Sequence, residues 1–488
     1  MNGTARQIKL GAFLMQTGHH IAAWRHPEAQ ADAGQNFQHY VELARLAEAA
    51  KFDAIFLADS VGIRNAHQTS LYRTARAAHF EPLTLLSALA AVTSKIGLIA
   101  TASTTYNEPY HIARKFASLD LISGGRSGWN LVTSSGEGEA QNFNLSSHVA
   151  HADRYARAEE FHDVVTGLWD SWQDDALIAD KAEGIHFDPS KLSPLHHAGD
   201  HFTVRGPLNV ARSPQGRPVV VQAGASEAGQ ALAARTAEVI FVAHQTFEEA
   251  QTFYRAIKTQ VAQQGRAPDD VKIMPGIFPV VGRTQAEAEE KFETLQSLIH
   301  PDVGLALLGN MIGGVDLSSY PVDGPIPDLP ETNGGKSRQR LLLDLARRDG
   351  LTIRQLYLRI AGARGHQQVV GTAESIADQL QHWFENEAAD GFNIMSPWLP
   401  GGLTDFIEHV LPELRRRGLV RTDYTGTTLR DHLGLARPLN RRTPSATQTQ
   451  PVPQVGLPPQ AGSHRAPTSH ADSPTESPAR ESAAIPVG

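Results

Sequence analysis

Short runs of apolar and β-branched residues alternate with segments of helical periodicity along most of the chain. The runs cover residues 8–14, 52–59, 96–103, 125–134, 218–224, 238–243, 272–281 and 391–396. Strands that are apolar on both faces are typical of a parallel sheet covered by helices. Eight such strands, each followed by a helical pattern up to residue 418, predict an α/β fold, a (β/α)8 barrel with insertions.

A doubly wound sheet is the competing fold. It is disfavoured because no Gly-x-Gly-x-x-Gly motif follows the first predicted strand, where a dinucleotide-binding fold would carry it.

Three segments interrupt the alternation and are predicted insertions. Residues 60–81 have the pattern of a long loop, and residues 173–217 hold turn signals with a β-like segment at 201–204. Residues 300–366 are rich in Gly and Pro, with one predicted helix near 338–349. Long insertions in barrels are commonly active-site covers, so 60–81 and 300–366 are the candidate lids.

The predicted domain boundary lies near residue 435. Residues 1–435 form the barrel domain, whereas residues 436–488 are rich in Pro, Ser, Thr, Gln and Ala with few large apolar side chains. Such a segment cannot bury enough apolar surface to offset its ordering entropy, so a disordered tail is expected.

Composition narrows the functional classes. A formal charge of −8 without a long basic run gives no footprint for nucleic acid or an anionic membrane. The absence of cysteine excludes disulfides, thiolate metal sites and a cysteine nucleophile. No apolar run has the length of a membrane span and no signal-peptide pattern begins the chain, so a cytoplasmic protein is expected.

Polar residues cluster where the predicted strands end, and in a barrel all those ends lie on one rim. The rim residues are His19, His20, Asp59, Ser103, Thr104, Asn130, Thr133, Ser226 and Ser396. The rim lacks paired carboxylates, which disfavours a two-carboxylate glycosidase. The adjacent side chains of His19 and His20 diverge, which disfavours a metal pair, and no metal is expected.

Two segments could receive an anion. Ser226 is placed to cap a helix whose N-terminal N–H groups would face a bound anion. His151 and Tyr155 are four residues apart and share a helix face, where they could donate to the same group or simply lie at the surface.

Several motifs together resemble the bacterial luciferase-like flavin monooxygenases. The motifs are Gly-Arg-Ser-Gly-Trp-Asn-Leu-Val-Thr-Ser at 125–134, Ala-Ala-Trp-Arg-His-Pro at 22–27, Phe-Leu-Ala-Asp at 56–59, Ser-Thr-Thr-Tyr-Asn-Glu-Pro-Tyr at 103–110 and Gln-Ala-Gly-Ala-Ser-Glu at 222–227. The resemblance covers residues 6 to 435 and is strongest to the branch of nitrilotriacetate monooxygenase component A and the dibenzothiophene-sulfone and long-chain alkane monooxygenases.

This resemblance implies an FMNH2-dependent monooxygenase whose reduced FMN comes from a separate NAD(P)H:FMN reductase. Oxygen would add at flavin C4a, and the hydroperoxide would transfer one oxygen atom from O2 to a small organic substrate. Relatives are usually dimers or tetramers, so a homo-oligomer is expected.

The resemblance also implies roles for the rim residues. Those expected at the isoalloxazine or ribityl part are Asp59, Ser103 or Thr104, and Asn130, and those expected at the phosphate are His151, Tyr155 and Ser226. Some relatives carry a histidine directly after the Val-Thr-Ser string, where this chain has Ser135. His19 is therefore the preferred catalytic histidine, and Asn130 is the second candidate catalytic residue.

Three alternatives remain open at this point. The same fold could use deazaflavin F420 for hydride transfer, although the Gly-Trp-Asn string argues against it. It could bind flavin without catalysis. A hydrolase barrel is more distant, because carboxylate pairs and a metal triad are lacking.

Overall fold

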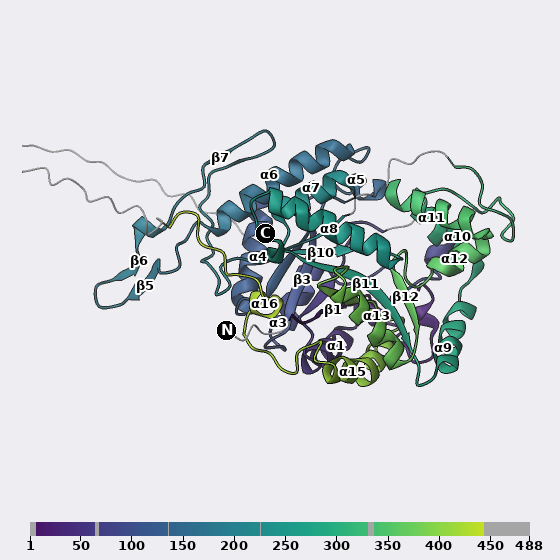
Figure 1. Cartoon of the computed structure of the whole chain (residues 1–488). Coiled ribbons are helices and arrows are strands. Elements are labelled where there is room, and N and C mark those ends of the chain that lie inside the picture. The colour runs from purple at the N-terminus through teal and green to yellow at the C-terminus, as the bar shows by residue number, and fades with distance from the viewer. Residues whose placement is uncertain (1–5, 64–67, 135, 225, 330–335, 444–488) are drawn as a thin grey trace, which may run out of the picture. The chain divides into compact units, whose positions relative to one another are not determined.

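Eight parallel strands close into a barrel in the computed structural model, which describes residues 6–443 except 64–67, 135, 225 and 330–335 (Figure 1). In order around the barrel they are β1 (Lys9–Phe13), β2 (Ala54–Leu57), β3 (Gly97–Ser103), β4 (Ser127–Val132), β9 (Val219–Ala223), β10 (Val239–Val242), β11 (Lys272–Val281) and β13 (Gly391–Ile394). Pairing of β10 with β11 and of β1 with β13 completes the closure. The predicted (β/α)8 barrel is confirmed, and each predicted strand contains an observed one.

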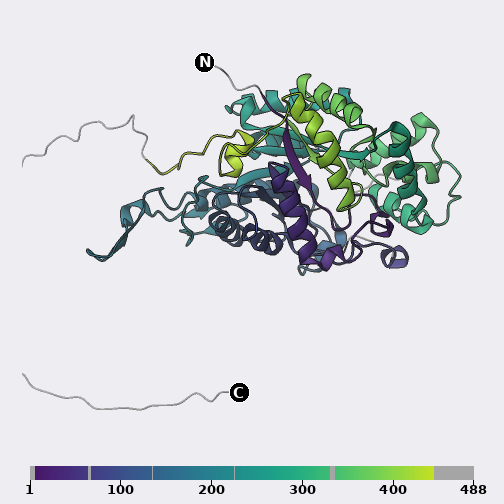
Figure 2. The same cartoon turned by 90° about the horizontal axis from the view of Figure 1, so that it is seen from below.

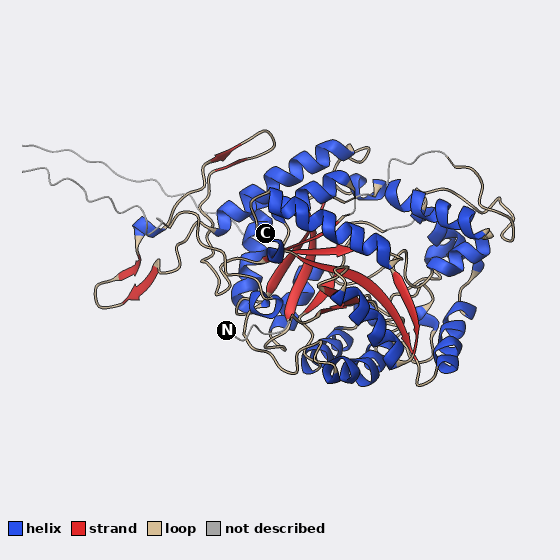
Figure 3. Ribbon diagram, viewed as in Figure 1, coloured by secondary structure: helices blue, strands red, loops and turns tan. Residues whose placement is uncertain are grey.

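Helices surround the strands on the outside (Figure 3). Those that follow the barrel strands are α1 (Phe37–Ala49), α3 (Pro82–Ala90), α4 (Pro109–Ile122), α6 (His151–Trp169), α7 (Glu227–Thr236), α8 (Phe247–Gln263), α9 (Gln285–Ser297), α13 (Ala373–Glu385) and a final run of α14 (Gly401–Asp405), a π-helical turn (Phe406–Val410) and α15 (Leu411–Arg416). Pro82 and Pro109 each stand in the first turn of their helix, where a missing N–H costs no hydrogen bond.

Alternate residues of β4 face opposite sides of the barrel wall. Trp129 is fully buried on the outer side against Phe116 of α4 and Phe161 of α6, with ring centroids 6.0 and 5.9 Å away. Asn130, the next residue, therefore faces the barrel interior. One face of β4 thus packs against the surrounding helices, and its other face presents the Asn130 amide to the barrel interior.

The N-terminal end of the barrel is closed by the short helix α16 (Leu429–Leu433). Leu429 and Leu433 belong to the interior core with Ile99 of β3 and Val219 of β9. A Cβ on Gly128 would lie 2.9 Å from Ile99 Cγ1, so glycine is needed for this close packing. With this end filled, the C-terminal end is the one available to a ligand, as in other barrels of this type.

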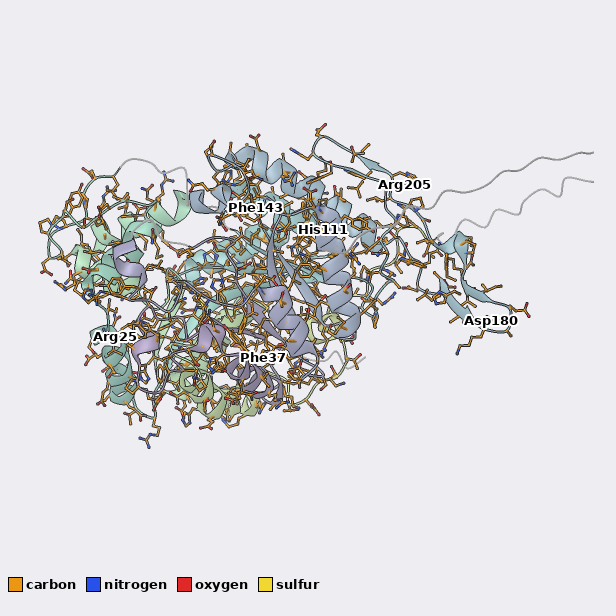
Figure 4. All side chains as sticks on the ribbon, turned by 180° about the vertical axis from the view of Figure 1, so that it is seen from behind. Arg25, Phe37, His111, Phe143, Asp180 and Arg205 are labelled. Atoms are coloured by element: carbon orange, nitrogen blue, oxygen red, sulfur yellow. The ribbon has the colours of Figure 1, made fainter. Side chains whose placement is uncertain are left out.

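Two insertions lie at opposite ends of the barrel. Residues 173–217 form an arm with two hairpins, β5 (Leu177–Asp180) with β6 (Ile185–Phe187) and β7 (His197–Ala198) with β8 (Thr203–Val204). Figures 1 and 2 show this arm projecting from one end of the barrel, and the helices of the other insertion lie at the far end. Figure 4 likewise places Asp180 and Arg205 of the arm far from Arg25, which lies in the loop between β1 and α1.

The insertion at 300–366 contains more structure than its sequence predicted. Besides α11 (Lys336–Asp349), which agrees with the predicted helix, it holds α10 (Pro301–Met311) and α12 (Ile353–Ile360). Gly304 and Gly309 weaken the helical pattern of α10, but Gly304 lets α10 approach the ring of Tyr357, to which a Cβ would come within 2.5 Å. Tertiary packing here outweighs intrinsic propensity.

The loop at 60–81 also contains a short helix, α2 (Gln68–Leu71), and this helix contacts α10. The two segments expected to form a lid are therefore in contact. After α12, the added strand β12 (Gln367–Gly371) pairs with the second half of β11 outside the barrel closure.

Residues 436–443 contact the base of the arm. Arg437 forms an ion pair with Asp174, and Asn440, which is 5% exposed, donates to the backbone carbonyls of Asp170 and Trp172. The rest of the predicted tail, residues 444–488, lies outside the described residues.

Truncation after Thr443 should therefore leave the melting temperature within about 1 °C, whereas truncation after Arg437 should lower it by several degrees. The shorter chain loses the hydrogen bonds of the buried Asn440 amide, a loss on the order of 1–3 kcal/mol. Differential scanning calorimetry of the two truncated chains beside the full chain measures the difference. Equal melting temperatures for both would show that residues 438–443 add no stability.

Candidate functional site

Small side chains are exposed at the C-terminal ends of two strands on different sides of the barrel. Ala58 directly follows β2 and Ala223 ends β9, and both are exposed although the residues preceding them are buried. Their exposure marks the C-terminal end of the barrel as accessible from outside. The polar residues around this end define the candidate site.

Asn130 is held by a relay of hydrogen bonds inside the barrel. Its Nδ2 donates to Thr101 Oγ1 at 2.8 Å, and the Thr101 hydroxyl donates to the carbonyl of Leu57 at 2.8 Å. Because the Thr101 proton is committed to a carbonyl, Thr101 can only accept from Asn130, and this fixes the orientation of the amide. Asn130 Oδ1 is buried and, within the described part of the chain, has no hydrogen-bond partner, so it is an acceptor available to a ligand.

Ser103 and Thr104 have different surroundings. Ser103 Oγ accepts from the backbone N–H of Thr105 at 3.1 Å and from the Ser134 hydroxyl at 2.8 Å, so its own proton can go to a ligand. Thr104 is fully buried, and its hydroxyl donates to the carbonyl of Val132 at 3.2 Å. Of the two, Ser103 has the contact geometry of a ligand donor.

Tyr155, Ser226 and His151 come together at the N-terminus of α7. The Tyr155 hydroxyl lies 3.3 Å from Ser226 Oγ, and the rings of His151 and Tyr155 are 4.8 Å apart. Ser226 is the N-cap of α7, as predicted, and accepts the N–H of Gly229 at 3.2 Å. A Cβ on Gly229 would lie 3.2 Å from the Tyr155 hydroxyl, so the glycine keeps this corner open.

Asp59 lies at the end of β2 and is tied to the loop at 60–81. Its carboxylate is 3.6 Å from Nε2 of His79, and 15% of its side chain is exposed. The two residues therefore join the second strand end to a segment expected to cover the site.

His19 is buried, and the hydrogen bonds of both its ring nitrogens are determined. Nε2 lies 2.8 Å from the carbonyl of Phe13, which can only accept, so Nε2 carries the proton. Nδ1 then accepts from Nη2 of Arg364 at 2.6 Å. Burial, with the charge of Arg364 next in importance, holds the pKa of His19 well below its usual value. The ring is therefore neutral and in a single tautomer.

His20 is similar, with Nδ1 accepting the N–H of Ala22 at 3.2 Å and Nε2 3.1 Å from Oε1 of Gln296. Burial lowers the pKa of His20 to about 4. The side chains of His19 and His20 have separate partners. Among the described residues, no group of three or more His, Asp or Glu side chains is arranged to hold a metal ion.

Two arginines beside His19 were missed by sequence reasoning. Arg76, in the loop at 60–81, donates through Nη2 to the carbonyls of Gly18, His19 and His20 at 3.0, 3.1 and 3.4 Å.

The second arginine, Arg364, comes after the end of α12. Both guanidinium groups contact Met15 Sδ, at 2.9 Å from Arg76 Nη1 and 3.1 Å from Arg364 Nη2. Neither residue comes directly after a barrel strand, so the search for polar residues at strand ends could not find them.

The order of the strands separates these groups into two sides. In the closed eight-stranded barrel β9 stands four strands from β1 in either direction, so Ser226 after β9 is opposite His19 after β1. Asn130 of β4 and Ser103 of β3 lie on the wall between them. Sites at the C-terminal end of such barrels are built by several different strands in this way.

A barrel of parallel strands with polar groups converging from several strand ends has the architecture of an enzyme for a small ligand. Residues 13–390 match the family model described as luciferase-like monooxygenase, and the chain belongs to that family. It is therefore an enzyme of the monooxygenase class, and the family is flavin-dependent. The family and branch indicated by the sequence motifs are confirmed.

The chain is similar over most of its length to named monooxygenases. It is 55% identical to the N-acetyl-S-(2-succino)cysteine monooxygenase of Bacillus subtilis (strain 168), over 90% of this chain and 99% of that protein. It is 50% identical to nitrilotriacetate monooxygenase component A of Aminobacter aminovorans, over 90% and 98%. A riboflavin lyase solved with modified FMN and riboflavin is 34% identical, with a TM-score of 0.80 over 89% of this chain and 97% of that one.

Across residues 6–443, apart from the gaps given above, no helix combines the length and apolar character that crossing a membrane requires.

The His19 ring should bind no proton between pH 5 and 8. In 15N-histidine spectra, with the His19 signal assigned by its loss in His19→Gln, Nε2 should show the shift of a protonated nitrogen and Nδ1 that of an acceptor throughout. Because the lowered pKa belongs to the folded state only, this residue also favours unfolding as the pH falls below about 6.5. A titration midpoint near 6.5 would contradict the assigned hydrogen bonds.

Proposed function

We propose that the protein is the oxygenase component of a two-component system, using FMNH2 and O2 to oxygenate a small organic substrate S. The overall reaction is FMNH2 + O2 + S → FMN + SO + H2O, in which one oxygen atom enters the substrate and the other is reduced to water. The bound reduced flavin supplies the electrons that activate O2. A separate NAD(P)H:FMN reductase is the proposed source of FMNH2, and the name "component A" of a 50% identical relative supports this.

The observation that carries the proposal is the contact of Tyr155 with Ser226 at the N-terminus of α7. A phosphate there would meet the Tyr155 hydroxyl, the Ser226 hydroxyl and the N–H groups of the first helical turn. These donors are neutral. His151, whose ring packs on Tyr155, is the further donor proposed at this end. A neutral cradle suits a flavin that enters and leaves in each cycle.

The wall between the two sides fits the polar edge of a flavin. Asn130 Oδ1 is an acceptor open to a ligand, and reduced flavin offers N–H donors. Ser103 Oγ can donate to a flavin acceptor, and Asp59 at the neighbouring strand end is the third proposed contact. The buried and fixed orientation of Asn130 means that little reorganisation is needed when the ligand binds.

His19 is proposed as a positioning residue. Its Nε2 proton is given to the carbonyl of Phe13 and its Nδ1 lone pair receives Arg364, so the ring orients Arg364 and has no nitrogen free to exchange a proton. Water exclusion falls to the segments around α2 and α10, which contact each other at the end of the barrel where the ligand enters.

The names of two similar relatives guide the choice of substrates to try. N-acetyl-S-(2-succino)cysteine and nitrilotriacetate are both polycarboxylates, the first a thioether and the second a tertiary amine. Compounds of this kind are therefore the first proposed for the substrate S.

Ser226→Asp should weaken FMN binding by about tenfold or more, because the added carboxylate repels the phosphate dianion. Aspartate is as good an N-cap as serine, so the helix itself should be unaffected. Fluorescence titration of FMN with each protein measures the dissociation constant.

Ser226→Asn is the matched control, since asparagine also caps helices but carries no charge. It should bind FMN within about threefold of the parent protein. Equal affinities for the Asp and Asn variants would remove Ser226 from the phosphate site.

The reaction itself is tested with a generic flavin reductase, NADH, FMN and 18O2. Transfer of one labelled atom into a thioether, amine, sulfone or alkane substrate, detected by mass spectrometry, is the expected result. NADH loss is uninformative because free reduced flavin consumes oxygen unaided. Release of peroxide alone with every substrate would favour a non-catalytic flavin-binding protein, and tight binding of reduced F420 in place of FMNH2 would favour hydride transfer.

A further inference from the structure

We propose that Arg76 and Arg364 together bind a carboxylate of the substrate, so that the enzyme selects carboxylate-bearing substrates. This inference rests on the proposed monooxygenase function and assigns a carboxylate subsite to the side of the barrel opposite the phosphate cradle. The two arginines come from different segments, the loop at 60–81 and the end of the insertion at 300–366, and they meet beside His19.

The first observation is the convergence of two cations on one neutral atom. Arg76 Nη1 and Arg364 Nη2 lie 2.9 and 3.1 Å from Met15 Sδ, and a thioether is only a weak acceptor. The other hydrogen bonds of Arg76 go to neutral backbone carbonyls. Two guanidinium groups held this close together form a concentrated positive charge.

Among the described residues, the hydrogen-bond partners of Arg76 are neutral, so they do not balance its charge. Burial alone lowers the pKa of Arg76 to about 10, which leaves the group charged at neutral pH. A charged group withdrawn from water normally has a partner of opposite sign. His19 is neutral and supplies no negative charge. A substrate carboxylate would place a negative charge beside Arg76.

The second observation is the backbone at Arg364. Its φ is +50°, a left-handed conformation that costs a non-glycine residue energy, and it is followed by Gly365 at +91°. Gly362 fixes the same turn against Phe278, because a Cβ there would come within 2.6 Å of the ring. The turn directs Arg364 towards His19 and Met15. The left-handed backbone at Arg364 costs conformational energy, and an arginine that merely faced solvent would not need it.

The third observation is the contact between Arg364 and His19. Since His19 has a single tautomer, its Nδ1 always receives Nη2 of Arg364, and this bond fixes the plane of the guanidinium group. A planar, oriented guanidinium is the group best suited to a carboxylate, which it can meet through two parallel hydrogen bonds. A carboxylate held here would place the rest of the substrate over the centre of the barrel.

The test compares Arg364→Gln, Arg364→Lys and the control Arg359→Gln. Glutamine can still donate to His19 but is neutral, lysine keeps the charge, and Arg359 lies on α12, a different element of the same insertion. The probe is N-acetyl-S-(2-succino)cysteine, a tricarboxylate. Its dissociation constant from the flavin-free protein is measured by calorimetry, and its KM and kcat by 18O incorporation with a flavin reductase.

Arg364→Gln should raise both the dissociation constant and KM about tenfold or more, with Arg364→Lys intermediate and Arg359→Gln unchanged. FMN affinity should be unaffected in all three. Loss of FMN affinity in Arg364→Gln would assign the arginines to the flavin phosphate and overturn the proposal, as would equal probe binding by Arg364→Gln and the parent protein.

A second measurement needs no variant. The parent protein should oxygenate the tricarboxylate at least about tenfold more efficiently than its trimethyl ester, which keeps the thioether and removes the charges. Equal efficiency with both would overturn the carboxylate site and leave the monooxygenase function standing. Absence of labelled product from every substrate, with peroxide released, would instead contradict the proposed function.

Discussion

The hydrogen-bond relay from Asn130 through Thr101 to the carbonyl of Leu57 is the interaction on which the candidate site depends. It crosses three adjacent strands, β4, β3 and β2, so the orientation of one amide is set by the register of the barrel. Trp129, on the opposite face of β4, locks that register through its packing on α4 and α6. The polar group that a ligand would meet is thereby supported by buried packing on the outer face of the same strand.

Much of the barrel was predictable because its signals are local. Each strand is a short apolar run, and helix starts such as Ser226 and Pro82 carry their own capping chemistry. The family resemblance implied a shared role for Tyr155 and Ser226, and their hydroxyl groups lie 3.3 Å apart. Helix α10 was missed because Gly304 and Gly309 interrupt its helical pattern, and the close approach of Gly304 to Tyr357 is a contact that no periodicity reveals.

Arg76 and Arg364 could not have been predicted from strand ends. They belong to insertions far apart in the sequence, and their meeting depends on how those insertions fold over the loop after β1. The signal that remains in the sequence is indirect: a run of small residues, Ala361 to Ala363, before Arg364 and a glycine after it. Such a run permits a tight turn without saying what the arginine contacts, so its role is visible only in three dimensions.

β11 is ten residues long, and its second half pairs with β12 instead of a barrel neighbour. The chain that leaves the 300–366 insertion thus pairs with β11 as an added strand outside the barrel closure, whereas α10 packs on α12 and α2. Arg364 and His366 lie just before β12, which is tied to β11 by backbone pairing, whereas α10 and α12 come earlier in the insertion. A chimera that exchanges α10 to α12 for the corresponding segment of a relative would therefore best be joined between α12 and Arg364, so that Arg364 and β12 stay unchanged.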